Sequence, residues 1–206
     1  LVSVCHTDTA SENVASGMSG AGMVFSLVTQ VPYDTFASNV HRLEVWRSMS
    51  AAPINSLITV NLGDAGTGCA MLVDELSGVS TSGLSGANAV GSSAVSNVNA
   101  TSALTAFLAS FISTANGAYC TVGGDLNSAA DAPTQYIVLQ GTNFNNPATG
   151  LNSAWTTSNT TACQWVGAGT ADRGAVIVEL VADNPPPIVP GTGAWYQSYR
   201  RRVVLC

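Results

Sequence analysis

Hydrophobic and polar positions alternate with the period of a β-strand in the first half of the chain. The run His41–Arg47 alternates strictly, which predicts a strand with one face toward solvent and the other toward a core. Residues 56–62 form a second such run, closed by the turn former Gly63, and residues 69–76 form a third, more apolar run. The three runs predict consecutive strands separated by turns.

Further apolar runs of strand length are bounded by Gly, Asn, Asp or Pro, and Pro32 is expected to end one of them. They cover residues 1–4, 23–31, 118–122, 136–139, 153–156, 162–166 and 175–180. Residues 102–113 fit both helical and strand spacing, and we favour a strand. Many short strands with scarcely any helix predict an all-β fold, an antiparallel β-sandwich of jelly-roll type.

Residues 77–102 form a low-complexity tract of Ser, Gly, Asn, Ala and Val. Large side chains are too sparse here to anchor a core element against the entropic cost of ordering the chain. We therefore expect a long surface excursion with one weak strand over residues 89–95.

The composition changes at Asp183, where four prolines fall within residues 185–190 and predict an extended spacer. This divides the chain into a β-sandwich domain, residues 1–182, and a proline-led C-terminal extended arm, residues 183–206. The arm is expected to dock either on its own sandwich or on a neighbouring subunit. Its predicted subunit-contact residues are Trp195, Tyr196, Tyr199, Arg200, Arg201, Arg202, Val203, Val204 and Leu205.

Composition narrows the classes of function. Only 9% of residues are charged, the net charge is −6 and Lys is absent, so a nucleic-acid-binding surface is not expected. Apolar runs are all shorter than the roughly 18 residues that a membrane-spanning helix needs, so we expect no membrane span.

The five cysteines are widely scattered, with no Cys-x-x-Cys pair, so we expect neither zinc nor another cofactor. Cys69 and Cys120 lie in apolar strand patterns and are expected to be small buried thiols. One or two disulfides remain open.

Several segments also carry a family resemblance. Met23–Val31, Arg42–Met49, Ile58–Val60 and Glu75–Gly83, continued by the run from Trp155 through Trp165 to Glu179, together resemble the jelly-roll-like β-sandwich domain of tailed-bacteriophage structural proteins, of decoration or tail/fibre type. The resemblance covers roughly residues 1–182. It implies a virion or cell-surface sandwich and transfers no catalytic residue.

Catalytic groupings are poorly supported by the pattern. A Ser-His-Asp site would combine His6 or His41 with Asp34, Asp64 or Asp74. No Gly-x-Ser-x-Gly elbow precedes a helix, however, and we expect both histidines at exposed or rim positions. Glycosidase-like carboxylates would come from Asp74, Glu75, Asp125, Asp131 or Glu179. Asp74 and Glu75 are adjacent and should face opposite sides of a strand.

Two binding chemistries compete with a purely structural interpretation. Loops containing Asp125 and Asn127, or Asp172 and Arg173, offer oxygen ligands for Ca²⁺, but without EF-hand spacing. Aromatic residues are candidates for a sugar-stacking surface. We expect Trp46, Trp155 and Trp165 in the core, and Trp195 as an intersubunit anchor. The other candidates are Tyr33, Tyr119, Tyr136, Tyr196 and Tyr199.

The sequence therefore predicts a non-enzymatic bacteriophage virion structural protein, a capsid decoration (cement) protein or a tail/fibre component acting through subunit contacts. Its expected partners are other virion proteins and copies of itself, with a host-surface glycan as a further candidate. The alternative is a carbohydrate-binding adhesin module on a phage fibre or a secreted bacterial protein. A hydrolase with a shallow site ranks third.

Overall fold

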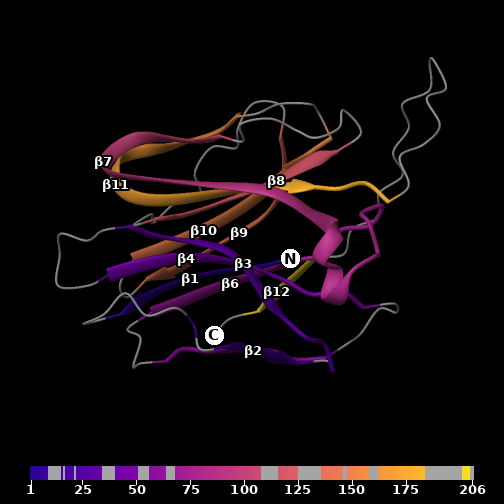
Figure 1. Cartoon of the computed structure of the whole chain (residues 1–206). Helices are drawn as coiled ribbons and strands as arrows, with labels where there is room; N and C mark the ends of the chain where they lie inside the picture. The colour runs from indigo at the N-terminus through magenta and orange to yellow at the C-terminus, as the bar shows by residue number, and fades with distance from the viewer. Residues whose placement is uncertain are drawn as a thin grey trace, which may run out of the picture.

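The fold is that of a computed structural model, which describes residues 1–8, 15, 17–20, 22–33, 40–50, 56–63, 68–107, 116–124, 136–145, 148–157, 162–183 and 201–204. In this part of the chain, two large antiparallel sheets pack face to face, and a smaller pair of strands lies outside them (Figure 1). The predicted all-β sandwich is confirmed. The jelly-roll connectivity stays a prediction.

The first sheet has the strand order β12-β6-β1-β4-β3. Its strands are β1 (Val2–Asp8), β3 (Ser26–Tyr33), β4 (Val40–Arg47), β6 (Gly68–Asp74) and β12 (Arg201–Val204). Strand β3 does not end at Pro32 as predicted, because it is an edge strand, where a missing N–H is tolerated. The carbonyl of Pro32 accepts a hydrogen bond from Asn97 Nδ2 at 3.0 Å.

The second sheet has the order β7-β11-β8-β10-β9. Its strands are β7 (Val90–Phe107), β8 (Gly117–Gly124), β9 (Ile137–Asn145), β10 (Ala148–Thr156) and β11 (Ala162–Leu180). A 3₁₀ segment, η1 (Leu84–Ala89), precedes β7. No helix in the described part of the chain is long and apolar enough to cross a bilayer.

Side chains from the facing sides of the two sheets form the central core. Close packing at its edge requires glycine, because a Cβ on Gly174 would lie 2.7 Å from the Tyr33 ring and one on Gly123 would lie 2.8 Å from Cys5 Sγ. The buried core side chains are Cys5, Val31, Tyr33, Leu43, Val45, Ala70, Leu72, Tyr119, Leu139, Leu151, Trp155, Val176, Val178 and Leu180.

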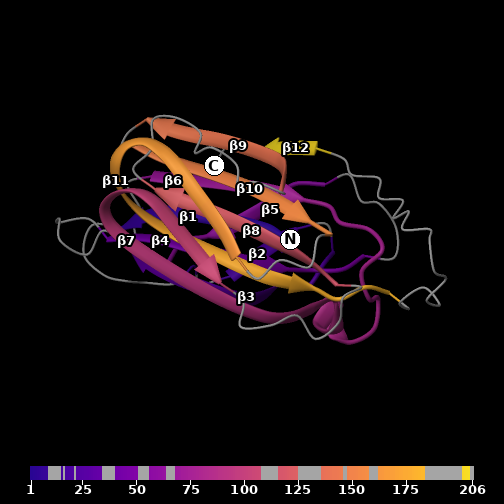
Figure 2. The ribbon, with the colours of Figure 1, turned by 90° about the horizontal axis from the view of Figure 1, so that it is seen from above.

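The outer face of the second sheet is covered by its own two longest strands. Strands β7 and β11 pair along their lengths, with register shifts between Val166 and Arg173, and curve back together over the sheet (Figures 1 and 2). A second core fills the space beneath this folded hairpin. Its buried members are Ala106, Ala118, Cys120, Val122, Tyr136, Ala154, Cys163, Trp165, Ala175 and Ile177.

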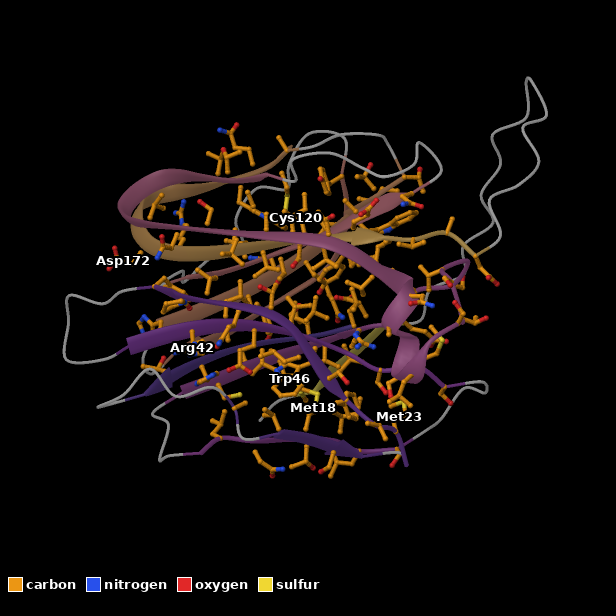
Figure 3. All side chains as sticks on the ribbon, viewed as in Figure 1. Met18, Met23, Arg42, Trp46, Cys120 and Asp172 are labelled. Carbon is orange, nitrogen blue, oxygen red and sulfur yellow. A yellow bond between two sulfur atoms is a disulfide. The ribbon has the colours of Figure 1, made fainter. Side chains whose placement is uncertain are left out.

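A disulfide between Cys120 on β8 and Cys163 on β11 fastens the folded hairpin to the sheet. Cys120 lies under the hairpin in Figure 3. The indole Nε1 of Trp165 donates a hydrogen bond to Cys120 Sγ at 3.0 Å. The prediction of a buried thiol at Cys120 is therefore wrong, because the bend in β11 brings a second cysteine to it, whereas Cys69 is buried as predicted.

The outer face of the first sheet is covered by the two-stranded sheet of β2 (Gly17–Gly20) and β5 (Ile58–Asn61). Figure 3 shows Met18 and Trp46 in the layer between them. The buried members of this third core are Val2, Val4, Ala15, Trp46, Cys69 and Met71. Both large sheets are thus covered on both faces.

The structure corrects three sequence predictions. Strand 41–47 exists, but residues 41–46 are all buried rather than alternately exposed. Residues 77–102 are not a surface excursion with one weak strand, because β7 runs from Val90 to Phe107. Its main chain pairs with β11, so the strand does not depend on large side chains of its own. Residues 162–166 and 175–180 belong to one strand, β11.

The predicted arm contributes a strand to the first sheet. Residues 201–204 form β12, which pairs with β6. The division into a domain of residues 1–182 and an arm of residues 183–206 stays a prediction. The structure adds that the chain's own sandwich accepts part of the arm.

Replacing Cys120 and Cys163 together by serine is expected to lower the free energy of unfolding by roughly 2–4 kcal/mol, because the disulfide closes a loop with a sequence separation of 43 residues. Urea unfolding followed by tryptophan fluorescence measures the change. Reductant should destabilise the unchanged protein by a similar amount and leave the double variant unaffected. Equal stability of the oxidised protein and the variant contradicts the expectation.

Candidate functional site

Both histidines are buried, so their predicted exposed or rim positions are wrong. His6 is 4% exposed and His41 is 3% exposed. They lie on opposite faces of the first sheet, because His6 pairs with Arg42 and Thr7 with His41 in the antiparallel register. The His41 ring lies 5.3 Å from that of Tyr33 in the central core.

His6 belongs to a buried polar cluster under the outer layer of the first sheet. Its Nε2 lies 3.1 Å from Glu44 Oε1. The same carboxylate oxygen accepts the backbone N–H of Ala15 at 2.8 Å, and Glu44 Oε2 accepts the indole N–H of Trp46 at 2.7 Å. Every partner comes from the interior, so this cluster joins the sheet to the chain that covers it.

Burial alone would raise the pKa of the Glu44 carboxyl. The hydrogen bonds from His6, from the Ala15 amide and from Trp46 outweigh that effect, and the pKa of Glu44 is lowered. The carboxylate is therefore held in its charged form inside the protein. A charged group surrounded by three donors is satisfied, and such a group has little to offer a substrate.

A second buried cluster links the two large sheets. The Tyr119 hydroxyl on β8 donates to Asp74 Oδ2 on β6 at 2.8 Å and lies 2.5 Å from Ser3 Oγ on β1. Asp74 Oδ1 accepts Gln140 Nε2 of β9 at 2.7 Å. Burial, together with the negative charge of Asp74, raises the pKa of Tyr119 well above its ordinary value, so the phenol stays protonated.

The predicted carboxylate candidates do not converge. Asp74 is buried between the sheets, whereas Glu75 is exposed. This agrees with the prediction that the two adjacent side chains face opposite sides of a strand. Glu179 is buried beneath the folded hairpin, where its Oε1 accepts Asn116 Nδ2 at 2.8 Å and its Oε2 accepts the Ser92 N–H at 2.9 Å. The remaining acidic candidates lie outside the described residues: Asp34, Asp64, Asp125 and Asp131.

The calcium candidates give no cluster in the described part of the chain. Arg173 is fully buried, and burial lowers the pKa of its guanidinium. Asp125 and Asn127 lie outside the described residues. Among the residues that the structure describes, no three His, Cys, Asp or Glu side chains gather as metal ligands would.

The tryptophan prediction is confirmed where the structure tests it, because Trp46, Trp155 and Trp165 are all buried. Tyr33, Tyr119 and Tyr136 are buried too, and burial raises the pKa of Tyr136 to about 12. Five predicted contact residues lie outside the described residues: Trp195, Tyr196, Tyr199, Arg200 and Leu205. Arg201 to Val204 are described as strand β12.

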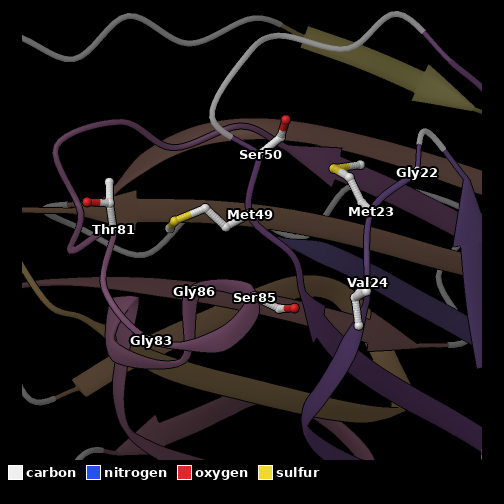
Figure 4. A pocket seen from close by; sticks show the side chains of 9 residues that line it. All are labelled: Gly22, Met23, Val24, Met49, Ser50, Thr81, Gly83, Ser85 and Gly86. Carbon is white, nitrogen blue, oxygen red and sulfur yellow. The ribbon is translucent and has the colours of Figure 1, made fainter.

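An open groove of about 390 Å³ lies beside η1 (Figure 4). Arg47 Nη1 anchors η1 by donating to the carbonyls of Leu84 and Ser85, at 3.1 and 2.8 Å. The groove brings methionine side chains together with backbone and hydroxyl groups. Its lining residues are Gly22, Met23, Val24, Met49, Ser50, Thr81, Gly83, Ser85 and Gly86.

Exposed large apolar side chains lie next to one another at two places in the described part of the chain, whereas Leu57, Val95 and Val166 are exposed elsewhere. Val24, at 62% exposure, belongs to the groove, and Leu84, at 84%, lies in η1 next to it. Ile137 and Val138, at 52% and 45%, are neighbours on β9, the edge strand of the second sheet. The apolar run in the sequence predicts strand β9, but only the strand order of the sheet shows that β9 is an edge strand.

Comparison of the chain with protein-family models, with curated proteins and with solved structures found no match.

Glu44→Gln is expected to lower the free energy of unfolding at neutral pH by about 1–3 kcal/mol, because it removes the charge that three buried donors stabilise. The folded-state pKa of Glu44 lies below the ordinary value of 4.5, so its contribution is present above that pH and is lost as pH falls through the folded-state pKa. Urea unfolding between pH 7 and 3 should show the difference between the two proteins narrowing. A difference that stays constant contradicts this account.

Tyr119→Phe is expected to cost about 1–3 kcal/mol of unfolding free energy, because the buried Asp74 carboxylate loses a donor. The raised pKa of Tyr119 means that its stabilisation is present below the ordinary value of 10.0 and is lost at higher pH. Guanidinium unfolding at pH 7 and at alkaline pH measures both effects. Tyr136→Phe is the matched control, and it should cost less because no carboxylate depends on that hydroxyl for a hydrogen bond.

Proposed function

We propose that this chain is a non-enzymatic structural protein of a bacteriophage virion, a capsid decoration protein or a tail or fibre component, which acts through contacts with other virion proteins and with copies of itself. The observation that carries the proposal is the pair of exposed apolar side chains, Ile137 and Val138, on the edge strand β9. Exposed apolar residues on an unprotected strand edge favour pairing with another chain.

In the described part of the chain, the four edges of the two large sheets differ in how they are protected. On β3, Pro32 removes a donor and Asn97 occupies its carbonyl. Strand β12 begins with two arginines, and the long strand β7 bends over the sheet. Strand β9, from Ile137 to Asn145, has no proline and no charged residue. It is therefore the edge at which a strand of a second copy meets the least resistance.

The interior supports a passive role. Hydrogen bonds inside the protein engage His6 and the buried carboxylates Glu44, Asp74 and Glu179. The ring of His41 contacts the ring of Tyr33. These networks hold the covering layers onto the sheets. A rigid layered body with neutral polar surfaces and apolar edges suits repeated contacts in a symmetric assembly.

The adhesin alternative needs a surface that binds sugars. Within the described part of the chain, every tryptophan is buried, so a stacking platform of those residues is not available. The groove beside η1 offers Ser50, Thr81 and Ser85 as hydrogen-bonding residues and no aromatic ring. These observations favour subunit contact, and a glycan array with the purified protein provides the comparison.

Val138→Lys is expected to reduce self-association, because a charge on the β9 edge must be desolvated when another strand pairs there. Val166→Lys is the matched control. Val166 is 40% exposed on β11, so a lysine there adds the same charge away from the β9 edge. Light scattering with size-exclusion chromatography measures the association, and incorporation into particles measures the function.

The proposal expects at least tenfold weaker association for Val138→Lys and little change for Val166→Lys, which corresponds to about 1.4 kcal/mol or more. Equal self-association of the two variants contradicts the proposed role of the β9 edge in subunit contact. Selective glycan binding by a protein that does not associate with itself or with particles supports the adhesin instead.

A further inference from the structure

The 3₁₀ segment η1 contains a strained stretch of backbone. Ser85 has φ +51°, and it is the only residue other than glycine with positive φ in the described part of the chain. Gly86 follows with φ +73°. The left-handed region is unfavourable for a residue that carries a side chain, so contacts from outside η1 must hold Ser85 there.

Two contacts from the end of β4 and the residues that follow it hold η1 in place. The first is the pair of hydrogen bonds from Arg47 to the carbonyls of Leu84 and Ser85. The second is packing by Met49. A Cβ on Gly86 would lie 3.1 Å from Met49 Cε and 3.8 Å from Met49 Sδ, and the three atoms nearest to that position all belong to Met49. Gly86 is buried, and the thioether covers it.

Met49 is also accessible to small molecules in solution. It is half-buried and lines the groove beside η1, together with Met23 (Figure 4). The other two of the four methionines are better protected, because Met71 is 1% exposed in the third core and Met18 packs against that core. A dissolved oxidant therefore reaches the groove methionines first.

We propose that Met49 is a methionine oxidation site, at which a hydroperoxide such as hydrogen peroxide forms the sulfoxide and thereby releases η1. Oxidation turns a flexible apolar side chain into a polar one. The new oxygen is attached to an atom that packs against buried Gly86, where close packing leaves little room for it. Met49 then no longer holds η1, and the groove changes shape.

The oxidation needs no reactant besides the peroxide. The Met49 sulfur attacks one oxygen of hydrogen peroxide, so the S–O bond forms and the O–O bond breaks. The proton of the transferred hydroxyl passes to the departing hydroxide, which leaves as water. The sulfur loses two electrons, and the peroxide gains them. The inference does not depend on the proposed virion function, because it concerns only the groove beside η1.

The first test measures where the full chain is oxidised. The protein is exposed to a limiting amount of hydrogen peroxide, quenched at intervals with free methionine, and digested for peptide mass mapping. Met49 and Met23 should be oxidised about tenfold or more faster than Met71, because the first two line an open groove and Met71 is buried. Equal rates at Met49 and Met71 overturn the proposal.

The second test measures the release of η1 by amide hydrogen exchange. The Asn88 N–H donates to the Ser82 carbonyl at 3.3 Å. The Val181 N–H donates to the Ala89 carbonyl at 3.0 Å. Both hydrogen bonds depend on the position of η1, so exchange at these two amides should increase about tenfold or more once Met49 is oxidised.

Two variants assign the effect to one sulfur atom. Met23→Leu keeps Met49 in the groove, and peroxide should still increase exchange at both amides. Met49→Leu is the matched control, because leucine has a similar volume and no sulfur, so peroxide should leave exchange unchanged. Unchanged exchange in Met23→Leu with Met49 oxidised overturns the proposal, as does an equal increase in both variants. Neither result bears on the β9 edge, so failure here is distinct from failure of the proposed function.

Discussion

Each of the two large sheets is buried on both faces, and this constraint governs the rest of the structure. The folded hairpin of β7 and β11 covers one sheet, and the strands β2 and β5 cover the other. A strand buried on both sides has no solvent to satisfy its polar side chains. Polar side chains on such strands therefore depend on partners inside the protein, and those partners determine how the layers fit together.

The buried charges follow from that requirement. Glu44 is fully buried, yet it is stabilised in its charged form by donors from β1, from β4 and from the covering chain. Asp74 similarly joins β6 to β8 and β9 through Tyr119 and Gln140. Residues that resemble catalytic acids and bases in the sequence thus act as connections between layers, because the fold surrounds them with donors.

How much the sequence predicts depends on whether the signal is local. The alternation at His41–Arg47 correctly predicts β4, but it also predicts a solvent face, because nothing in that run shows that β2 and β5 cover it. Strand β7 was predicted only in part, as a weak strand over 89–95 and a strand over 102–113, since its small residues depend on pairing with β11, more than fifty positions away in the chain. Cys120 was misassigned because its partner Cys163 reaches it only through the bend in β11. Burial of the tryptophans was predicted correctly, since large rings in strand patterns fill cores wherever the sheets meet.

The same layering also determines where the chain can meet other molecules. With a covering layer on the outer face of each sheet, most of both sheet faces is unavailable, and the edges carry the remaining unpaired main chain. Proline protects β3, arginine begins β12, and β7 curves away, while β9 presents Ile137 and Val138 to solvent. An interaction that uses the scaffold without disturbing its interior must therefore act through an edge or through the groove beside η1. Of these, the β9 edge combines apolar side chains with a row of main-chain groups, which is what a neighbouring strand requires.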